Sequence, residues 1–426
     1  MKSEFIIFRK NIKSNRAKFQ IYWIFFSDKS VDRLEDKAAI AVVLFKNNLT
    51  GDFMALSLME GNEAIGWGAI SAGCKFFAGY PITPATTIYN TMLKLLPPAG
   101  GVCMQGEDEI ASIGFCLGAS MAGLKVMTAT SGPGISLYSE QISFAIGSEI
   151  PIVIVDVQRL GPSTGSATKG ADGDIQFLRW GNSGGLPVIV LAPVDVKDCF
   201  VLTMHAFNLA EEYRCPVFIA ANKEISMTRE TVDLDALRVP DLKDRKTVDS
   251  ARSFLPFETT EGQLIPKFLP IGGKHLVRQT SSTHGPDGYI TTDPEQISRN
   301  QERLQQKLLG AVDDFLLYDW QPAEATETLI ITYGVTARAA RSAIIKLSNM
   351  GKPVSLLVLK TLWPVPERLI KELATPYKRI IVIEMNLGQY VREIERLLSG
   401  KNIIFLGQMN GELIKPGKIQ EVIENE

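Results

Sequence analysis

One acidic and one basic side chain are the residues of this sequence best placed to do chemistry. Glu109 lies in the first turn of a predicted helix, and Arg159 directly follows a predicted strand. A carboxylate can hold or move a proton, and a guanidinium binds anions such as carboxylates and phosphates. Both residues also have an ordinary explanation. Acids in a first helical turn complement the helix dipole, and many arginines are surface charges.

Two turns rich in Gly and Pro could offer backbone amides to an anion. The first is Gly79-Tyr80-Pro81-Ile82-Thr83-Pro84, in which Thr83 is expected to cap a helix that begins at Pro84. The second is Ser131-Gly132-Pro133-Gly134. Free amides at the positive end of a helix suit a carboxylate or a phosphate. An ordinary strand-to-helix turn has the same features, so both interpretations stay open.

The elements that position these residues alternate regularly. Apolar runs near 75–79, 101–105, 125–130, 152–157, 188–192 and 217–221 are typical of strands, and helical patterns separate them. This alternation predicts an α/β fold with a doubly wound parallel sheet. In such sheets ligands bind at the carboxyl ends of the strands. Glu109, both turns and the polar loop that begins at Arg159 all follow strands, so we expect them at one edge.

Breaks in this rhythm divide the chain into four parts. Residues 1–53 begin basic and lack the alternation, and we interpret them as an appendage. Residues 54–224 form the first α/β domain. Residues 225–325, rich in proline and charge, are interpreted as an excursion and linker. Residues 326–426 resume the alternation and predict a second, smaller α/β domain.

Composition argues against several classes of function. The 426 residues carry a formal net charge of −2, which gives no reason to expect nucleic acid or an anionic membrane as partner. No apolar run reaches the ~20 residues of a membrane span. The five cysteines lack the paired spacing of a zinc site or iron–sulfur cluster, so we predict no metal on this chain. Their odd number and scattered spacing favour the reducing cytoplasm.

Several motifs in one order resemble a known family. They are Gly79 to Pro84, the Glu109 helix with Gly118-Ala119, Thr130 to Gly134, and Gln158-Arg159 with Gly161-Pro162-Ser163-Thr164-Gly165. Together they resemble the alpha subunit of 2-oxoacid:ferredoxin oxidoreductases, most closely the 2-oxoglutarate type. The resemblance covers roughly Met54 to the C-terminus. Leu160 and Trp67 depart from the family pattern.

The resemblance implies a thiamine diphosphate site. The first domain would be the pyrimidine-binding domain, and the second would be of the transketolase C-terminal type. Glu109 would be the catalytic residue, hydrogen-bonded to the aminopyrimidine ring. Tyr80, Pro81, Ile82, Ser131, Gly132, Pro133 and Gly134 would complete the cofactor contacts. Thr83, Arg159, Thr164 and Thr168 would bind the oxoacid or coenzyme A.

The resemblance also implies a partner. The Gly-Asp-Gly…Asn pattern for Mg²⁺ and diphosphate is missing, and the nearest string, Gly170-Ala171-Asp172-Gly173-Asp174, lacks the flanking residues. A beta subunit would therefore carry Mg²⁺, the diphosphate site and a [4Fe-4S] cluster, in an assembly such as α2β2. The complex would convert 2-oxoglutarate and CoA to succinyl-CoA and CO2 and reduce ferredoxin. Pyruvate, branched-chain or aryl 2-oxoacids are alternative substrates, and a non-catalytic assembly subunit is a further alternative.

Overall fold

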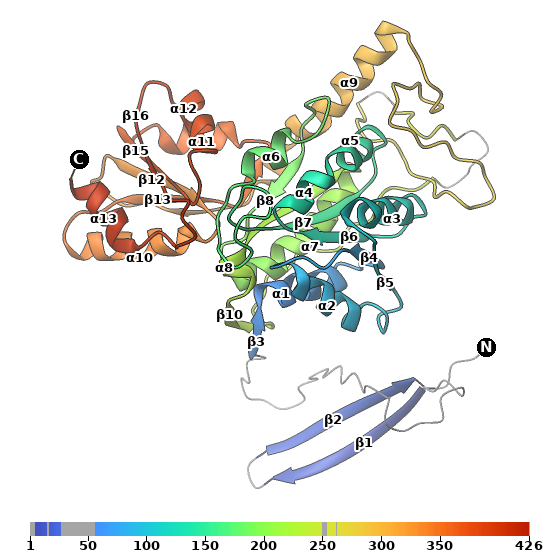
Figure 1. Cartoon of the computed structure of the whole chain (residues 1–426), viewed down its shortest axis with the longest axis horizontal. Coiled ribbons are helices and arrows are strands. Elements are labelled where there is room, and N and C mark those ends of the chain that lie inside the picture. The colour runs from blue at the N-terminus through green and yellow to red at the C-terminus, as the bar shows by residue number, and fades with distance from the viewer. Residues whose placement is uncertain (1–4, 15–16, 27–55, 249–253, 261, 426) are drawn as a thin grey trace. The chain divides into compact units, whose positions relative to one another are not determined.

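The computed structural model of the chain describes residues 5–14, 17–26, 56–248, 254–260 and 262–425 (Figure 1). These residues fall into two compact units, and one of them comprises residues up to 57 together with 233–236. Within it, β1 (Phe5–Ser14) and β2 (Ala17–Phe26) pair as an antiparallel hairpin. The rest of segment 1–53 lies outside the described residues, so its interpretation as an appendage stays a prediction.

The other unit contains a seven-stranded sheet in the order β14-β8-β9-β7-β6-β4-β5. All pairs are parallel except the edge pair of β14 with β8. Along β7, Val153 and Val155 face one apolar core and Ile152 and Ile154 face the other, as the two-residue period of a strand requires. The strands are β4 (Phe76–Gly79), β5 (Val102–Gln105), β6 (Val126–Thr130), β7 (Ile152–Gln158), β8 (Ile189–Leu191), β9 (Pro216–Asn222) and β14 (Thr361–Trp363).

Helices cover both faces of this sheet. The first core is completed by α1 (Gly61–Ser71), α2 (Thr86–Leu95) and α7 (Val196–Tyr213). The second core is completed by α3 (Glu109–Met121), α4 (Pro133–Leu137), α5 (Ser139–Gly147) and α6 (Ile175–Trp180). The short α8 (Lys223–Ser226) follows β9. The predicted doubly wound parallel α/β fold is therefore confirmed, with one antiparallel strand added at its edge.

The predicted helix cap at Thr83 is wrong. Helix α2 begins at Thr86, after Ala85, and receives no side-chain cap. The turn is held instead from another helix, because the Asn62 amide of α1 donates to the Pro84 carbonyl at 2.9 Å. This contact holds the turn through a carbonyl and leaves the first-turn amides of α2 without a side-chain cap.

The region between the two domains is anchored by buried charges. It contains β10 (Arg229–Asp233), which pairs with β3 (Leu56–Glu60), then α9 (Pro294–Leu309) and the 3-10 helix η1 (Val312–Phe315). Glu149 is fully buried and binds Lys307 of α9 at 2.8 Å and Arg303 at 2.6 Å. Burial alone would raise the pKa of Glu149, but Lys307 and Arg303 outweigh it and hold that pKa below its ordinary value.

The second sheet has the order β11-β13-β12-β15-β16, with β11 antiparallel to β13. Its elements are β11 (Tyr318–Gln321), β12 (Thr328–Tyr333), α10 (Thr336–Asn349), β13 (Ser355–Leu359), α11 (Glu367–Ala374), β15 (Arg379–Glu384), α12 (Val391–Leu397), β16 (Asn402–Gly407) and α13 (Pro416–Glu424). This part of the chain also supplies β14 to the first sheet. The two α/β parts are therefore joined by backbone hydrogen bonds between β14 and β8 as well as by side-chain contacts.

We expect Glu149→Gln to destabilise the chain by about 3–5 kcal/mol, because it leaves Lys307 and Arg303 buried without an anion. Urea unfolding followed by tryptophan fluorescence measures the change. Glu140→Gln is the matched control, since Glu140 is exposed on α5, the helix that precedes Glu149. Equal stability of the two variants would contradict a role for the buried network.

Candidate functional site

Glu109 is a buried carboxyl at a helix N-terminus. Asp108 caps α3 by accepting a hydrogen bond from the Ala111 amide at 2.7 Å, which makes Glu109 the first helical residue. The Glu109 side chain is only 6% exposed, although first-turn acids that merely complement a dipole are normally solvated. Helix α3 follows β5, so this carboxyl lies at the carboxyl edge of the parallel sheet. The ordinary dipole explanation does not account for its burial.

The second Gly/Pro turn is pressed against Glu109. A Cβ atom at Gly134 would come within 2.7 Å of Glu109 Oε1 and would also collide with Thr130 Oγ1. Gly132 has a φ of +47°, where glycine is favoured, and a Cβ there would meet Arg159 Nε at 3.3 Å. Both glycines are needed because the turn passes between Glu109 and Arg159 with no room for side chains.

Arg159 ties two loops together. Its Nη1 donates to the Thr83 carbonyl, and its Nη2 donates to the Thr164 carbonyl at 3.0 Å. The residue is 5% exposed, and burial lowers its pKa while Asp174 and Glu109 act in the opposite direction. The guanidinium thus fixes the first turn against the loop that follows β7, and Nε has no hydrogen-bond partner among the described residues.

The structure brings most of the predicted site residues to this edge. Thr83, Arg159, Thr164 and Gly132 are joined by the contacts above, and Glu109 meets Gly134. The remaining predicted residues follow the same strand ends: Tyr80 is 40% exposed, Pro81, Ile82 and Pro133 are half-buried, Ser131 is buried and Thr168 is exposed on the loop.

The buried polar groups around the turn that lack a partner among the described residues include Thr130 Oγ1, Ser131 Oγ and Arg159 Nε. Buried polar groups in proteins are nearly always hydrogen-bonded, so each calls for a ligand, a water or a neighbouring side chain. Together with the buried Glu109 carboxyl they make a polar cradle for a ring that carries both donors and acceptors. The thiamine aminopyrimidine is such a ring, so the residues present fit this cofactor.

Sequence reasoning missed a group of buried carboxyls beside the site. Burial raises the pKa of Asp156, at the end of β7, and Asp174 beside it raises that pKa further. Asp172 accepts a hydrogen bond from Asn222 at 2.6 Å, and burial nevertheless raises its pKa to about 7. The position of Asp156 within the apolar run 152–157 could have indicated its burial, whereas no sequence signal separates Asp172 and Asp174 from solvated loop acids.

Asp172 belongs to the junction of the two sheets. Its amide donates to the Met385 carbonyl at 2.9 Å, and its carbonyl accepts from Asn386 at 2.9 Å. Gln389 accepts from the Gln176 amide at 2.8 Å. The string 170–174, which resembles part of a metal motif, is therefore a structural connection. Within the ranges described, no group of three or more His, Cys, Asp or Glu side chains is arranged to hold a metal ion.

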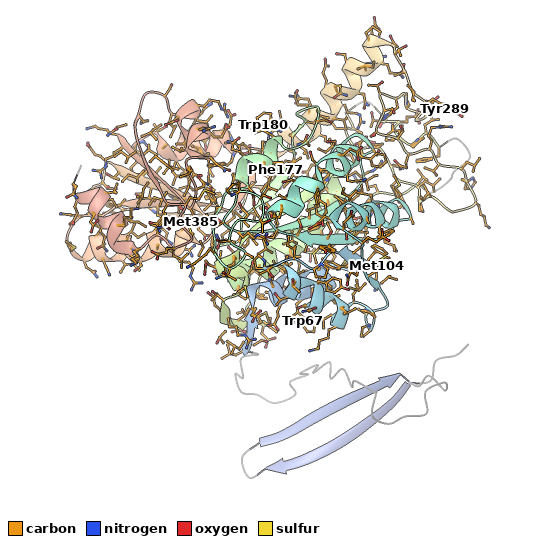
Figure 2. All side chains as sticks on the ribbon, viewed as in Figure 1. Trp67, Met104, Phe177, Trp180, Tyr289 and Met385 are labelled. Carbon is orange, nitrogen blue, oxygen red and sulfur yellow. The ribbon has the colours of Figure 1, made fainter. Side chains whose placement is uncertain are left out.

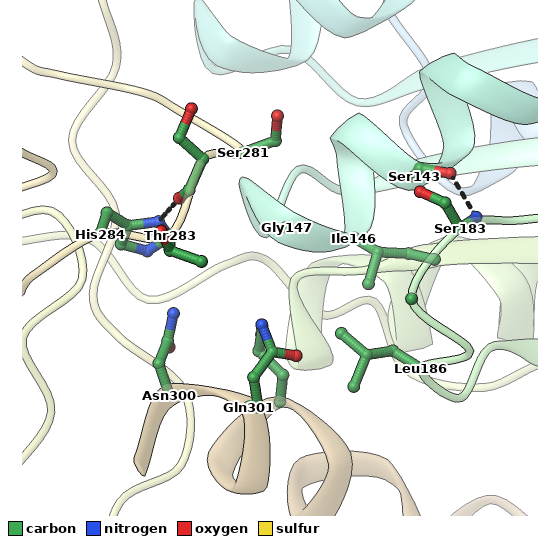
Figure 3. A pocket seen from close by; sticks show the side chains of 13 residues that line it. Ser143, Ile146, Gly147, Ser183, Leu186, Ser281, Thr283, His284, Asn300 and Gln301 are labelled. Atoms are coloured by element: carbon green, nitrogen blue, oxygen red, sulfur yellow. Dashed lines mark hydrogen bonds between the residues drawn. The ribbon is translucent and has the colours of Figure 1, made fainter. Parts of the chain in front are cut away.

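A separate polar pocket of about 180 Å³ lies elsewhere (Figure 3). It is lined by Gly147 at the end of α5, by the loop 281–284 and by α9. Since α5 ends just before β7 begins, this pocket lies at the amino edge of the sheet, opposite Glu109. His284 there is 4% exposed and its Nδ1 is 2.7 Å from the Ser282 carbonyl. None of the predicted site residues lines this pocket.

Two further observations concern the surface. Trp67, which departs from the family pattern, is 42% exposed on α1, so its ring is accommodated outside the core (Figure 2). Among the described helices, none combines the length and the apolar character that crossing a membrane requires.

We expect Gly134→Ala to destabilise the chain by about 1–3 kcal/mol, because its methyl group would overlap Thr130 and Glu109. Gly118→Ala on α3 is the matched control. A Cβ at Gly118 meets open space, and alanine is favoured over glycine in a helix by about 0.5–1 kcal/mol. Urea unfolding of both variants measures the difference, and equal stability would show that the turn does not press on Glu109.

Asp172 should make stability depend on pH. Its pKa is raised from 3.8 to about 7 in the folded chain. Its favourable contribution to the free energy of unfolding is therefore complete below pH 3.8 and is lost as the pH rises through 7. The expected slope in this window is about 1.4 kcal/mol per pH unit. Asp172→Asn cannot ionise and should lack this slope. Urea unfolding at pH 5, 6, 7 and 8 compares the two chains, and parallel curves would refute the assignment.

Comparison with known proteins agrees with this geometry. The family model for the thiamine diphosphate-binding domain of pyruvate flavodoxin/ferredoxin oxidoreductase matches residues 67–303. The model for core domain II of pyruvate:ferredoxin oxidoreductase matches residues 326–419. These matches span both α/β parts of the chain and include every predicted site residue.

Individual relatives extend the match along the chain. A 2-oxoglutarate synthase subunit KorA from Methanocaldococcus jannaschii is 39% identical over 87% of this chain and 100% of its own length. A ketoisovalerate oxidoreductase subunit VorB from Methanothermobacter thermautotrophicus is 34% identical over 87% of this chain and 97% of its own. A solved 2-oxoglutarate:ferredoxin oxidoreductase from Magnetococcus marinus is 34% identical, with a TM-score of 0.82 over 87% of this chain and 65% of that one. This chain therefore belongs to the thiamine diphosphate-binding pyruvate flavodoxin/ferredoxin oxidoreductase family.

Proposed function

We propose that this chain is the alpha subunit of a 2-oxoglutarate:ferredoxin oxidoreductase. The complex would convert 2-oxoglutarate and CoA to succinyl-CoA and CO2 and pass two electrons to ferredoxin. The observation that carries the proposal is the buried Glu109 carboxyl, which faces a glycine turn with unpartnered polar groups around it. The choice of 2-oxoglutarate rests on the KorA relatives and on the solved relative, whose structure holds 2-oxoglutarate, coenzyme A and succinyl-CoA.

The residues of this chain would hold thiamine diphosphate by its pyrimidine end. When bound, this cofactor supplies a nucleophilic carbon and an electron sink for decarboxylation. Glu109 would hydrogen-bond the ring nitrogen and exchange a proton with it, in a site where burial excludes competing water. The Ser131–Gly134 turn would lie against the ring, and Tyr80, Pro81 and Ile82 would flank it from the first turn.

Substrate contacts come from the loops that Arg159 joins. The guanidinium donates to the Thr83 and Thr164 carbonyls and retains Nε, so it would orient these loops as well as attract an anion. The hydroxyls of Thr83, Thr164 and Thr168 would then contact the oxoacid carboxylate or coenzyme A. We assign Arg159 both parts, because it joins the two loops and keeps one donor, Nε, without a partner among the described residues.

A partner subunit would complete the site. We propose that it binds the diphosphate through Mg²⁺, carries the [4Fe-4S] cluster that reduces ferredoxin, and assembles with this chain as α2β2. The five cysteines are unpaired, which fits a reducing cytoplasm. The VorB relatives favour a branched-chain 2-oxoacid as the second candidate substrate.

The test is turnover by this chain co-purified with its partner subunit. We expect 2-oxoglutarate to support CoA-dependent reduction of ferredoxin at least tenfold faster than pyruvate, 2-oxoisovalerate or an aryl oxoacid, or about 1.4 kcal/mol in transition-state binding. Preference for 2-oxoisovalerate would establish the second candidate. Equal rates with all four acids would overturn the assignment of substrate.

Glu109→Gln tests whether this chain takes part in catalysis. We expect it to lower kcat by about 10²–10⁴-fold, because an amide cannot exchange a proton with the cofactor ring. Glu107→Gln is the matched control, since Glu107 is exposed two residues earlier in the same turn. Unchanged turnover in Glu109→Gln would instead indicate a non-catalytic assembly subunit.

A further inference from the structure

Thr130 carries a buried hydroxyl close to Glu109. It is the last residue of β6, it is fully buried, and its Oγ1 has no hydrogen-bond partner among the described residues. The same strand carries Thr128 two residues earlier, also fully buried, whose hydroxyl is fully engaged. The two threonines point the same way from the strand but have different surroundings.

Thr130 and Glu109 share the small space that Gly134 leaves open. A Cβ built at Gly134 would touch Thr130 Oγ1 and Glu109 Oε1 together, so the two oxygens border a gap too narrow for a methyl group. The hydroxyl and the carboxyl are therefore close neighbours across this gap. A carboxylate accepts a hydrogen bond from a hydroxyl more strongly than a neutral acceptor does.

Tyr138 supplies a second acceptor behind Thr130. The Thr128 hydroxyl donates to the Ala78 carbonyl at 2.8 Å, and it is 2.8 Å from the Tyr138 hydroxyl. Because a threonine has one hydroxyl proton, Tyr138 must donate to Thr128. The hydroxyl proton of Tyr138 is thus already used in a hydrogen bond to Thr128, and its oxygen can accept a hydrogen bond from Thr130. Burial raises the pKa of Tyr138, and nearby Glu109 adds to that effect, so the phenol stays neutral.

We propose that Thr130 is a positioning residue for Glu109. Its hydroxyl donates to the carboxylate when Glu109 is ionised and turns to the Tyr138 oxygen when Glu109 carries the proton. The hydroxyl proton therefore follows the protonation state of Glu109 without leaving Thr130. The contact with Thr130 therefore aims the carboxyl at the cofactor ring when Glu109 is ionised. The inference rests on the proposed function, because it concerns how Glu109 meets thiamine diphosphate.

The test compares Thr130→Val, Thr130→Ser and wild type, each as the full chain co-purified with its partner subunit. Calorimetry measures the affinity for thiamine diphosphate, and circular dichroism of the bound aminopyrimidine measures the ratio of its amino and imino tautomers. We expect Thr130→Val to weaken binding about tenfold, which corresponds to about 1.4 kcal/mol, and to shift the tautomer ratio. Thr130→Ser, which keeps the hydroxyl, should restore both properties.

Thr128→Val is the matched control, because it removes a neighbouring hydroxyl that does not border Glu109. It should lower the thermal midpoint by unpairing Ala78 and Tyr138, but it should leave the affinity for thiamine diphosphate and the tautomer ratio near those of wild type. If Thr130→Val does not fold, Thr130→Ala replaces it as the variant without a hydroxyl.

The possible results separate the two proposals. If the wild-type complex binds thiamine diphosphate and Thr130→Val shows the same affinity and tautomer ratio, the role of Thr130 is overturned and the proposed function stays intact. Failure of the wild-type complex to bind thiamine diphosphate overturns the proposed function and this inference with it. Loss of binding in both Thr130→Val and Thr130→Ser also overturns the inference, because the effect would then follow the shape of the side chain and not its hydroxyl.

Discussion

The close approach of the turn after β6 to the first residue of α3 is the constraint on which the site depends. Glu109 can be buried at the helix N-terminus because Gly134 leaves its carboxyl just enough space and Asp108 caps the helix in its place. Burial keeps this carboxyl from bulk water. A carboxyl held in this way can exchange a proton with a ligand without first losing a hydration shell.

The loops around Glu109 are held by groups that come from elsewhere in the fold. Asn62 of α1 fixes the first turn through the Pro84 carbonyl, and Arg159 joins that turn to the loop after β7. The loop then enters the junction at Asp172, which is bonded to Asn222 and to the segment after β15. The second α/β part therefore supports the site indirectly, through the loop that carries the proposed substrate contacts.

Burying carboxyls at this junction is costly, because each must either bind a proton or accept hydrogen bonds from neighbouring donors. Glu384 finds four, from Tyr333, Asn386 and the amides of Tyr390 and Val391. Among the described residues Asp172 has one donor, Asn222, and burial raises its pKa despite that hydrogen bond. The junction is accordingly most stable when Asp172 is protonated.

The sequence by itself determined the architecture and the edge of the sheet on which the site lies, because apolar periodicity and Gly/Pro turns are local signals that alternate with the strands. It also singled out Glu109, Arg159 and both turns. Only the tertiary structure decided that Asn62 holds the turn at Pro84, that β14 crosses into the first sheet, and that Thr130 lies beside Glu109. These features depend on contacts between residues far apart in the chain, which no local pattern encodes.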